Sequence, residues 1–117
     1  MPNKSFGSVK VFFADKDKVL CRLKEYVHRL KAERSDVEKV GLFGSYATDR
    51  YGPASDVDLL ILLSHSDKRF LDRIPEFMPD DLGIDCDVFP YTEDEIAKMK
   101  DDGNLWIRHV LKEVVWL

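Results

Sequence analysis

Apolar side chains recur every three or four residues from Asp15 to about Arg34, and charged side chains fill the positions between them. This period is typical of an amphipathic helix that buries one face. The apolar positions are Val19, Leu20, Leu23, Tyr26, Val27 and Leu30. Residues 9–13 have a weaker apolar pattern that predicts a short strand or arm. The first clear element is therefore a helix over 15–34, which Asp15 or Asp17 can cap.

Three shorter apolar runs have the length and flanking residues of β-strands. They span residues 37–43, 56–63 and 84–89. Gly44-Ser45 ends the first run, after which 46–49 predict a short helical turn and 50–55 a loop. The second run closes with five apolar residues, 59–63, so both of its faces should be covered in a central strand. Pro90 is expected to end the third strand.

The remaining segments have helical patterns. Residues 67–78 predict a helix that Pro79 stops. The stretch Thr92-Glu93-Asp94-Glu95 has capping-box spacing and predicts a helix to about Lys100, and Asn104 can cap a last helix over 104–115. Helices and strands in this order predict one α/β (α+β) domain over 1–117, a small mixed β-sheet flanked by helices.

Composition narrows the class of protein. The chain has 117 residues, of which 44% are hydrophobic and 34% charged, enough for one core with a solvated surface. No apolar run approaches the roughly 20 residues of a membrane span, and the first residues lack the apolar segment of a secretory signal. The only two cysteines, Cys21 and Cys86, lie within apolar patterns. We therefore expect buried free thiols and a cytoplasmic location, with no membrane contact.

Charge is unevenly distributed along the chain. Residues 1–53 have a balance of +4 and residues 54–103 a balance of −9, within a net charge of −4. The basic residues gather on the predicted first helix, and no basic stripe with interleaved aromatic residues is present. Direct binding of nucleic acid is therefore disfavoured.

The acidic half contains closely spaced carboxylates at the starts of two predicted strands. Asp56 and Asp58 are two residues apart, so both project from one face of their strand. Crowded carboxylates repel each other, and a divalent cation such as Mg²⁺ relieves that repulsion. A third carboxylate from the next strand, either Asp85 or Asp87, would allow two metal ions to act in a displacement at phosphorus. Periodicity does not choose between those two, because they share a strand face.

A Gly-Ser pair lies between the first two predicted strands. Gly44 permits a tight turn and close approach of backbone to a ligand. The N–H groups of the turn and the Ser45 hydroxyl could hold the terminal phosphates of a nucleoside triphosphate. The chain has neither the P-loop nor the Rossmann glycine pattern. The Gly-Ser pair is informative because it ends one predicted strand and the aspartate pair begins the next.

Gly44-Ser45, ten residues and then Asp56-x-Asp58 resemble the GS-x10-DxD signature of minimal nucleotidyltransferases, which belong to the DNA polymerase β-like superfamily. Residues 84–92 resemble that family's third-aspartate strand, and the likeness covers about 37–96. The resemblance implies a polymerase β palm-like fold. It also implies that Asp56, Asp58 and Asp87 are the catalytic and metal-binding set for two Mg²⁺ ions, and that Gly44 and Ser45 bind phosphate. Many relatives have Arg-Gly where this chain has Thr48-Asp49, and Arg50 is the candidate replacement.

The resemblance further implies transfer of a nucleoside monophosphate, AMP from ATP, to an acceptor. Some small proteins of this type are antitoxins that add AMP to a helical HEPN-family partner, and this role is our first expectation. Transfer to a small molecule such as an aminoglycoside is the second, and a non-catalytic partner-binding module is the third. Packing of the last helix against the sheet is expected, but the apolar stretch 115–117, if it is exposed, would suit a partner or self-association as a homo-oligomer.

Overall fold

The computed structural model describes residues 16–48, 56–80 and 82–117. Its elements in chain order are α2 (Lys16–Glu33), β1 (Val37–Phe43), the 3₁₀ turn η1 (Gly44–Tyr46), β2 (Val57–Leu63), α3 (Phe70–Phe77), β3 (Cys86–Thr92), α4 (Glu93–Asp101), α5 (Leu105–Glu113) and β4 (Val115–Trp116). The predicted arm over 9–13, Asp15 and Arg50 lie outside the described residues.

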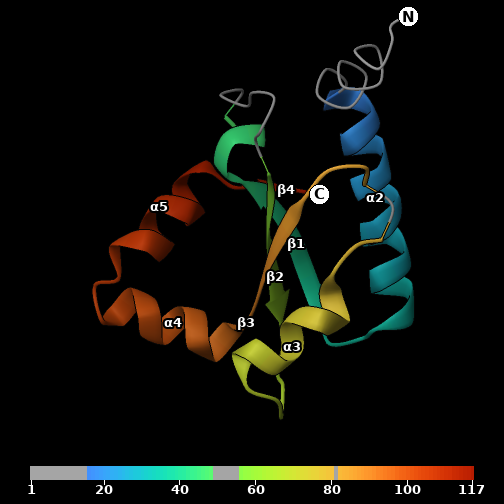
Figure 1. The fold of residues 1–117 in the computed structure, drawn as a ribbon. Helices are drawn as coiled ribbons and strands as arrows, with labels where there is room; N and C mark the ends of the chain where they lie inside the picture. The colour runs from blue at the N-terminus through green and yellow to red at the C-terminus, as the bar shows by residue number, and fades with distance from the viewer. Residues whose placement is uncertain (1–15, 49–55, 81) are drawn as a thin grey trace, which may run out of the picture.

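The four strands form one mixed sheet in the order β3-β2-β1-β4. Strand β1 is antiparallel to both β2 and β4, and β2 is parallel to β3. Helix α2 lies along one face of the sheet, and α4 and α5 lie on the other (Figure 1). The predicted fold class, a small mixed sheet flanked by helices, is confirmed.

Strand β2 is buried on both faces, as its apolar run predicts. Leu59, Ile61 and Leu63 pack into the larger core, which includes the apolar face of α2. Leu60 points the other way and packs with Ile107 of α5 and its neighbours. Side chains of a strand alternate between faces, so a continuous apolar run suits a strand that is covered on both sides.

Two boundaries differ from the sequence prediction. Strand β3 covers Cys86–Thr92, so Pro90 lies inside the strand and does not end it. Proline is tolerated there because β3 is an edge strand, where the missing N–H costs no ladder hydrogen bond. Helix α3 is shorter than predicted and has Pro75 within it. The capping box of α4 is confirmed, with Glu95 N–H donating to Thr92 Oγ1 at 3.2 Å and Thr92 N–H to Glu95 Oε1 at 2.8 Å.

The last predicted helix, over 104–115, is wrong at its end. Helix α5 stops at Glu113, and Val115 and Trp116 form β4 against β1. The β-branched run Val114-Val115 favours extended backbone, and β1 offers a free edge for it. Cys21 also differs from expectation because it is exposed, whereas Cys86 is buried, and both thiols are free. No helix in the described part of the chain is both long and apolar enough to cross a membrane.

Gly41 is what lets β4 pack closely beside β1. A Cβ at Gly41 would overlap the Val114 side chain and approach Trp116 Cε3 to 2.9 Å. We expect Gly41→Ala to lower the free energy of unfolding by about 2–3 kcal/mol, measured by urea denaturation, because the added methyl displaces β4. Gly103→Ala is the control. Its Cβ meets nothing within 4 Å, so only the cost of its positive φ, about 1 kcal/mol, is expected. Equal losses in the two variants would contradict this role.

Candidate active site

The ends of three neighbouring strands lie side by side, and we call this row of strand ends the acidic edge of the sheet, as distinct from its edge strands. Strand β1 ends there at Phe43, and β2 and β3 begin there. Asp58 is the register partner of Phe43 on one side and of Asp87 on the other. The strand register therefore places the Gly44 turn, Asp58 and Asp87 side by side.

Asp58 is the most perturbed carboxylate of this edge. It is partly buried, and its pKa is raised to about 6. Burial is the main cause because it disfavours the charged form, and repulsion from Asp87, Asp56 and Glu113 adds to it. All the charged side chains that shift this pKa are carboxylates, and none is a lysine, arginine or histidine. Such an arrangement is typical of a functional site.

The other aspartates lie around Asp58 at different positions. Asp56 is exposed and precedes β2 by one residue. Asp87 is directly opposite Asp58 on the parallel neighbour strand, and both alternate with buried residues, so they share a face. Asp85 precedes β3, and its carbonyl oxygen accepts a hydrogen bond from Val57 N–H at 2.9 Å. Asp87 repels Asp58 most strongly, which favours Asp87 over Asp85 as the third carboxylate.

The carboxylates at these strand ends are the kind of ligand that magnesium prefers, but they are not arranged as a closed set of ligands around one point. Within the described ranges, no three His, Cys, Asp or Glu side chains are gathered closely enough to form a metal site. Mg²⁺ usually takes one or two protein carboxylates and completes its shell with water and substrate phosphates. Asp58 and its neighbours fit that mode, since oxygen atoms are the ligands that Mg²⁺ prefers and a cation would relieve both the burial and the carboxylate repulsion that raise the pKa of Asp58.

Gly44 forms the corner between β1 and η1. Its φ of +76° is the left-handed conformation that glycine adopts without strain. A Cβ there would overlap Asp58 Oδ2, so the backbone lies directly against that carboxylate. The Gly44 carbonyl accepts hydrogen bonds from Ala47 N–H at 3.1 Å and from Thr48 N–H at 3.2 Å, which close the turn.

The Gly44 N–H has a partner that the sequence did not indicate. It donates to Glu113 Oε2 at 2.6 Å, across 69 residues of chain. The other carboxylate oxygen, Oε1, lies 2.6 Å from His109 Nε2. The Gly44 N–H is thus occupied within the protein, and a phosphate role of this turn depends on Ser45, which is partly exposed. A carboxylate at a helix C-terminus was the signal that could have singled out Glu113, because helix polarity disfavours it.

Cys86 lies next to Asp87, but its thiol is expected to be unreactive. Its thiol is buried, and its pKa is raised to about 12 by burial and by the negative charge of Asp87, Asp58 and Asp56. A thiol that stays protonated is a poor nucleophile and a poor metal ligand. The chemistry of the site therefore rests on its carboxylates.

The raised pKa of Asp58 makes the stability of the metal-free protein depend on pH. The folded state holds this proton more tightly than the unfolded chain does, so the contribution is full below about pH 4 and is lost as pH rises through 6. We expect Asp58→Asn to gain stability relative to wild type between pH 4 and pH 8, by ~1 kcal/mol after solvent screening. Urea denaturation in EDTA measures this difference, and a difference that does not change with pH would contradict it.

Comparisons with known proteins identify a family model and a solved structure that are similar to this chain. Residues 20–115 match the family model described as a nucleotidyltransferase domain, a range that begins within α2 and includes the Gly44 turn and all three aspartates. No curated protein matches the chain. The crystal structure of a "putative nucleotidyltransferase" from Sulfolobus solfataricus is similar, with a TM-score of 0.60 and 24% identity over 86% of this chain and 80% of that one. At that identity the likeness shows the fold.

The matched range covers most of the chain and contains every described residue of the site. The family model and the fold of the similar structure agree. The chain belongs to the nucleotidyltransferase domain family.

Proposed function

We propose that this protein is a magnesium-dependent nucleotidyltransferase of the minimal, GS-x10-DxD type, which transfers AMP from ATP to an acceptor on a partner protein. The observation that carries the proposal is the register of β1, β2 and β3. It brings the Gly44 turn, Asp58 and Asp87 together at one sheet edge, with Asp56 one residue before β2. Membership of the family supports nucleotidyl transfer as the class of reaction.

In this proposal the three aspartates bind the metal from two neighbouring strands. Asp56 and Asp58 would hold magnesium, and Asp87 would share it from the neighbouring strand. The bound metal would supply charge stabilisation at the α-phosphate and at the leaving group. The protein keeps these carboxylates close together at a cost, visible in the raised pKa of Asp58, so that they are in place when the nucleotide arrives.

The transfer itself is a substitution at phosphorus. The acceptor oxygen forms a bond to the α-phosphorus, the bond from that phosphorus to the α–β bridging oxygen breaks, and pyrophosphate leaves. The acceptor proton passes to a carboxylate, for which Asp87 is the candidate. The Ser45 hydroxyl and the Ser45 N–H would bind the terminal phosphates, in the way that the first amides of a helical turn bind anions, whereas the Gly44 N–H is already held by Glu113. Arg50 would add a positive charge.

The acceptor is proposed to come from a helical HEPN-family protein, with this chain as its antitoxin. All described elements belong to one sheet and the helices packed on it, so a partner would have to bring the acceptor. Apolar side chains are exposed on three elements, with Leu71 of α3 73%, Leu105 of α5 78% and Trp116 of β4 40% exposed. Such side chains are suited to a protein partner.

The test uses ATP labelled on the α-phosphate, magnesium and lysate of the host cells. Wild-type protein is compared with the Asp56→Asn/Asp58→Asn variant and with a matched control, Asp101→Asn/Asp102→Asn, which removes two exposed carboxylates at the end of α4. We expect label on a discrete protein with wild type and with the control only. Label on a small molecule would favour the aminoglycoside-type reaction.

Absence of transfer together with absence of magnesium-dependent ATP binding would overturn the proposal. It would favour the non-catalytic module, for which binding of a partner should survive the Asp56→Asn/Asp58→Asn change. Transfer that persists in that variant would also overturn the assignment of these two residues. Salt-dependent binding of a bare oligonucleotide would instead support nucleic-acid recognition, which the acidic balance of the central segment disfavours.

A further inference from the structure

Glu113 is the last residue of α5, yet it reaches the corner of the candidate site. Its Oε2 accepts the Gly44 N–H at 2.6 Å, and its side chain is only 11% exposed. Strand β4 fixes this position, since it is separated from α5 by one residue and pairs with β1, and Leu117 N–H donates to the Val40 carbonyl at 2.8 Å. The carboxylate therefore lies where the chain reverses from helix to strand, opposite the turn.

Two general rules disfavour a carboxylate here. The C-terminus of a helix has a partial negative charge, which repels an acidic side chain. Asp58 lies close enough for Glu113 to contribute to its raised pKa. His109 offsets part of this cost, with Nε2 at 2.6 Å from Glu113 Oε1. Residues that break local rules in a folded protein are often functional, and a specific hydrogen bond is visible here.

That hydrogen bond acts on the residue that joins the two halves of the site. Gly44 lies against Asp58 Oδ2 on one side, and its carbonyl closes η1 through the Ala47 and Thr48 amides. When Glu113 holds the Gly44 N–H, the peptide plane before Gly44 is fixed. The Ser45 N–H belongs to the next peptide, whose Gly44 carbonyl is held by the Ala47 and Thr48 amides, so the two sets of hydrogen bonds together set its direction.

We propose that Glu113 is a positioning residue, which holds the Gly44 peptide so that η1 is set for the triphosphate before the nucleotide binds. The role depends on a hydrogen-bond acceptor at this position and not on the negative charge. It rests on the proposed function for its consequence in nucleotide binding, whereas the hydrogen bond to Gly44 is a property of the protein alone. An organised turn gives tighter binding because less ordering remains to be done.

Two substitutions separate the hydrogen bond from the charge. Glu113→Gln keeps the length of the side chain and an acceptor oxygen, and Glu113→Ala removes both. Glu33→Ala, at the exposed end of α2, is the matched control. All variants are used as the full chain.

The first readout is hydrogen exchange of backbone amides, measured by NMR without nucleotide or metal. We expect Gly44 to exchange about tenfold faster or more in Glu113→Ala, and within about threefold of wild type in Glu113→Gln and Glu33→Ala. The amides of Leu60 and Ile61 in β2 report global unfolding and should be unchanged. Unchanged Gly44 exchange in Glu113→Ala would overturn the proposal, as would equal acceleration in β2, which would mean a general loss of stability.

The second readout is the dissociation constant of α,β-methylene-ATP with Mg²⁺, measured by calorimetry. We expect about tenfold weaker binding for Glu113→Ala and restoration to within about threefold by Glu113→Gln. Tighter binding in both variants would show that Glu113 competes with phosphate, and equally weak binding in both would show that its charge matters. Either result overturns the proposal. If wild type binds no analogue, the proposed function fails, and the exchange result alone decides the positioning role.

Discussion

Asp58→Asn is expected to reduce nucleotidyl transfer by about a thousandfold, equivalent to ~4 kcal/mol of transition-state stabilisation. The amide has the shape of the carboxylate but no charge, so it neither attracts a divalent cation nor neutralises one. Asp58 is the central carboxylate, paired in register with Phe43 and with Asp87. The variant should remain folded, since removal of the charge relieves the burial cost and the repulsion that raise the pKa of Asp58. Initial rates of transfer from α-labelled ATP measure the effect.

Single substitutions of Asp87 in β3 and of Asp85, which precedes that strand, complete this experiment and decide which of the two is the third carboxylate. Asp87→Asn should lose activity to a similar degree, because Asp87 faces Asp58 across the parallel pair. Asp85→Asn should stay within about threefold of wild type, because the structural contact of Asp85 is made by its backbone carbonyl. The opposite pattern would assign the third carboxylate to Asp85. Full activity of Asp58→Asn would remove the basis for a metal-dependent reaction at this edge.

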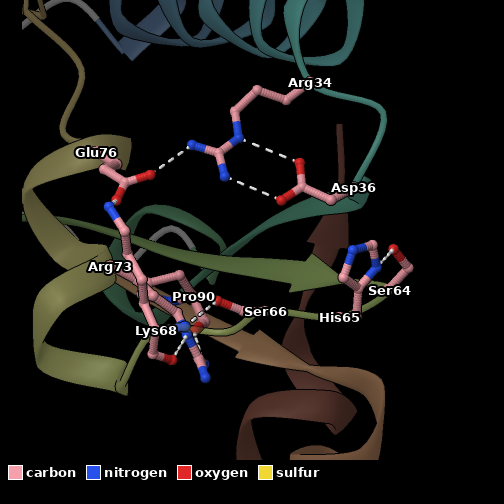
Figure 2. Close-up of polar contacts among 9 residues, drawn as sticks. All are labelled: Arg34, Asp36, Ser64, His65, Ser66, Lys68, Arg73, Glu76 and Pro90. Atoms are coloured by element: carbon pink, nitrogen blue, oxygen red, sulfur yellow. Dashed lines mark hydrogen bonds and ion pairs between the residues drawn. The ribbon is translucent and has the colours of Figure 1, made fainter.

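Arg73→Ala is expected to lower the free energy of unfolding by about 3–5 kcal/mol, the largest loss of stability that we predict. The Arg73 side chain is only 5% exposed and pairs with both oxygens of Glu95, at 2.7 and 3.1 Å. It also donates to the carbonyls of Lys68 at 2.9 Å and Pro90 at 3.0 Å (Figure 2). Removal leaves these acceptors without their donor and opens a cavity between α3, β3 and α4.

Arg69→Ala is the matched control for this prediction. Arg69 precedes α3 and pairs with Asp72, but its side chain is 88% exposed, so we expect a loss below about 0.5 kcal/mol. Urea denaturation at neutral pH compares the two variants with wild type. Similar losses for Arg69→Ala and Arg73→Ala would show that burial of the Arg73 network contributes little. Transfer activity per folded molecule should be unchanged in both variants, because neither arginine belongs to the site.

Much of the fold could be read from local patterns. The apolar period of α2, the capping box of α4 and the two-sided apolar run of β2 each reflect a rule that acts within one segment. Asp56 and Asp58 could also be singled out from local sequence, because a spacing of two residues predicts one face of a strand; in the structure Asp58 lies in β2 and Asp56 precedes it by one residue. Gly44 was singled out by its distance from that pair, and its positive φ agrees with its expected turn.

Other features depended on how segments meet in space. Pro90 lies within β3 because β3 is at the edge of the sheet. The choice of Asp87 over Asp85 is favoured by the register with β2, and alternation along β3 treats both alike. The buried Arg73 network joins three elements, and α3 alone gives no sign of it.

The sequence by itself therefore determined most of the helices and strands, the sheet-and-helix class and the acidic residues with their Gly-Ser turn, since periodicity and turn chemistry are properties of neighbouring residues. Only the tertiary structure decided that the chain ends in β4, and that this strand carries Glu113 to the Gly44 N–H. The physical reason is that a hydrogen bond across 69 residues leaves no local pattern. It exists because β4 pairs with β1, and that pairing depends on the free edge of a sheet and on a glycine, Gly41, which makes room for it.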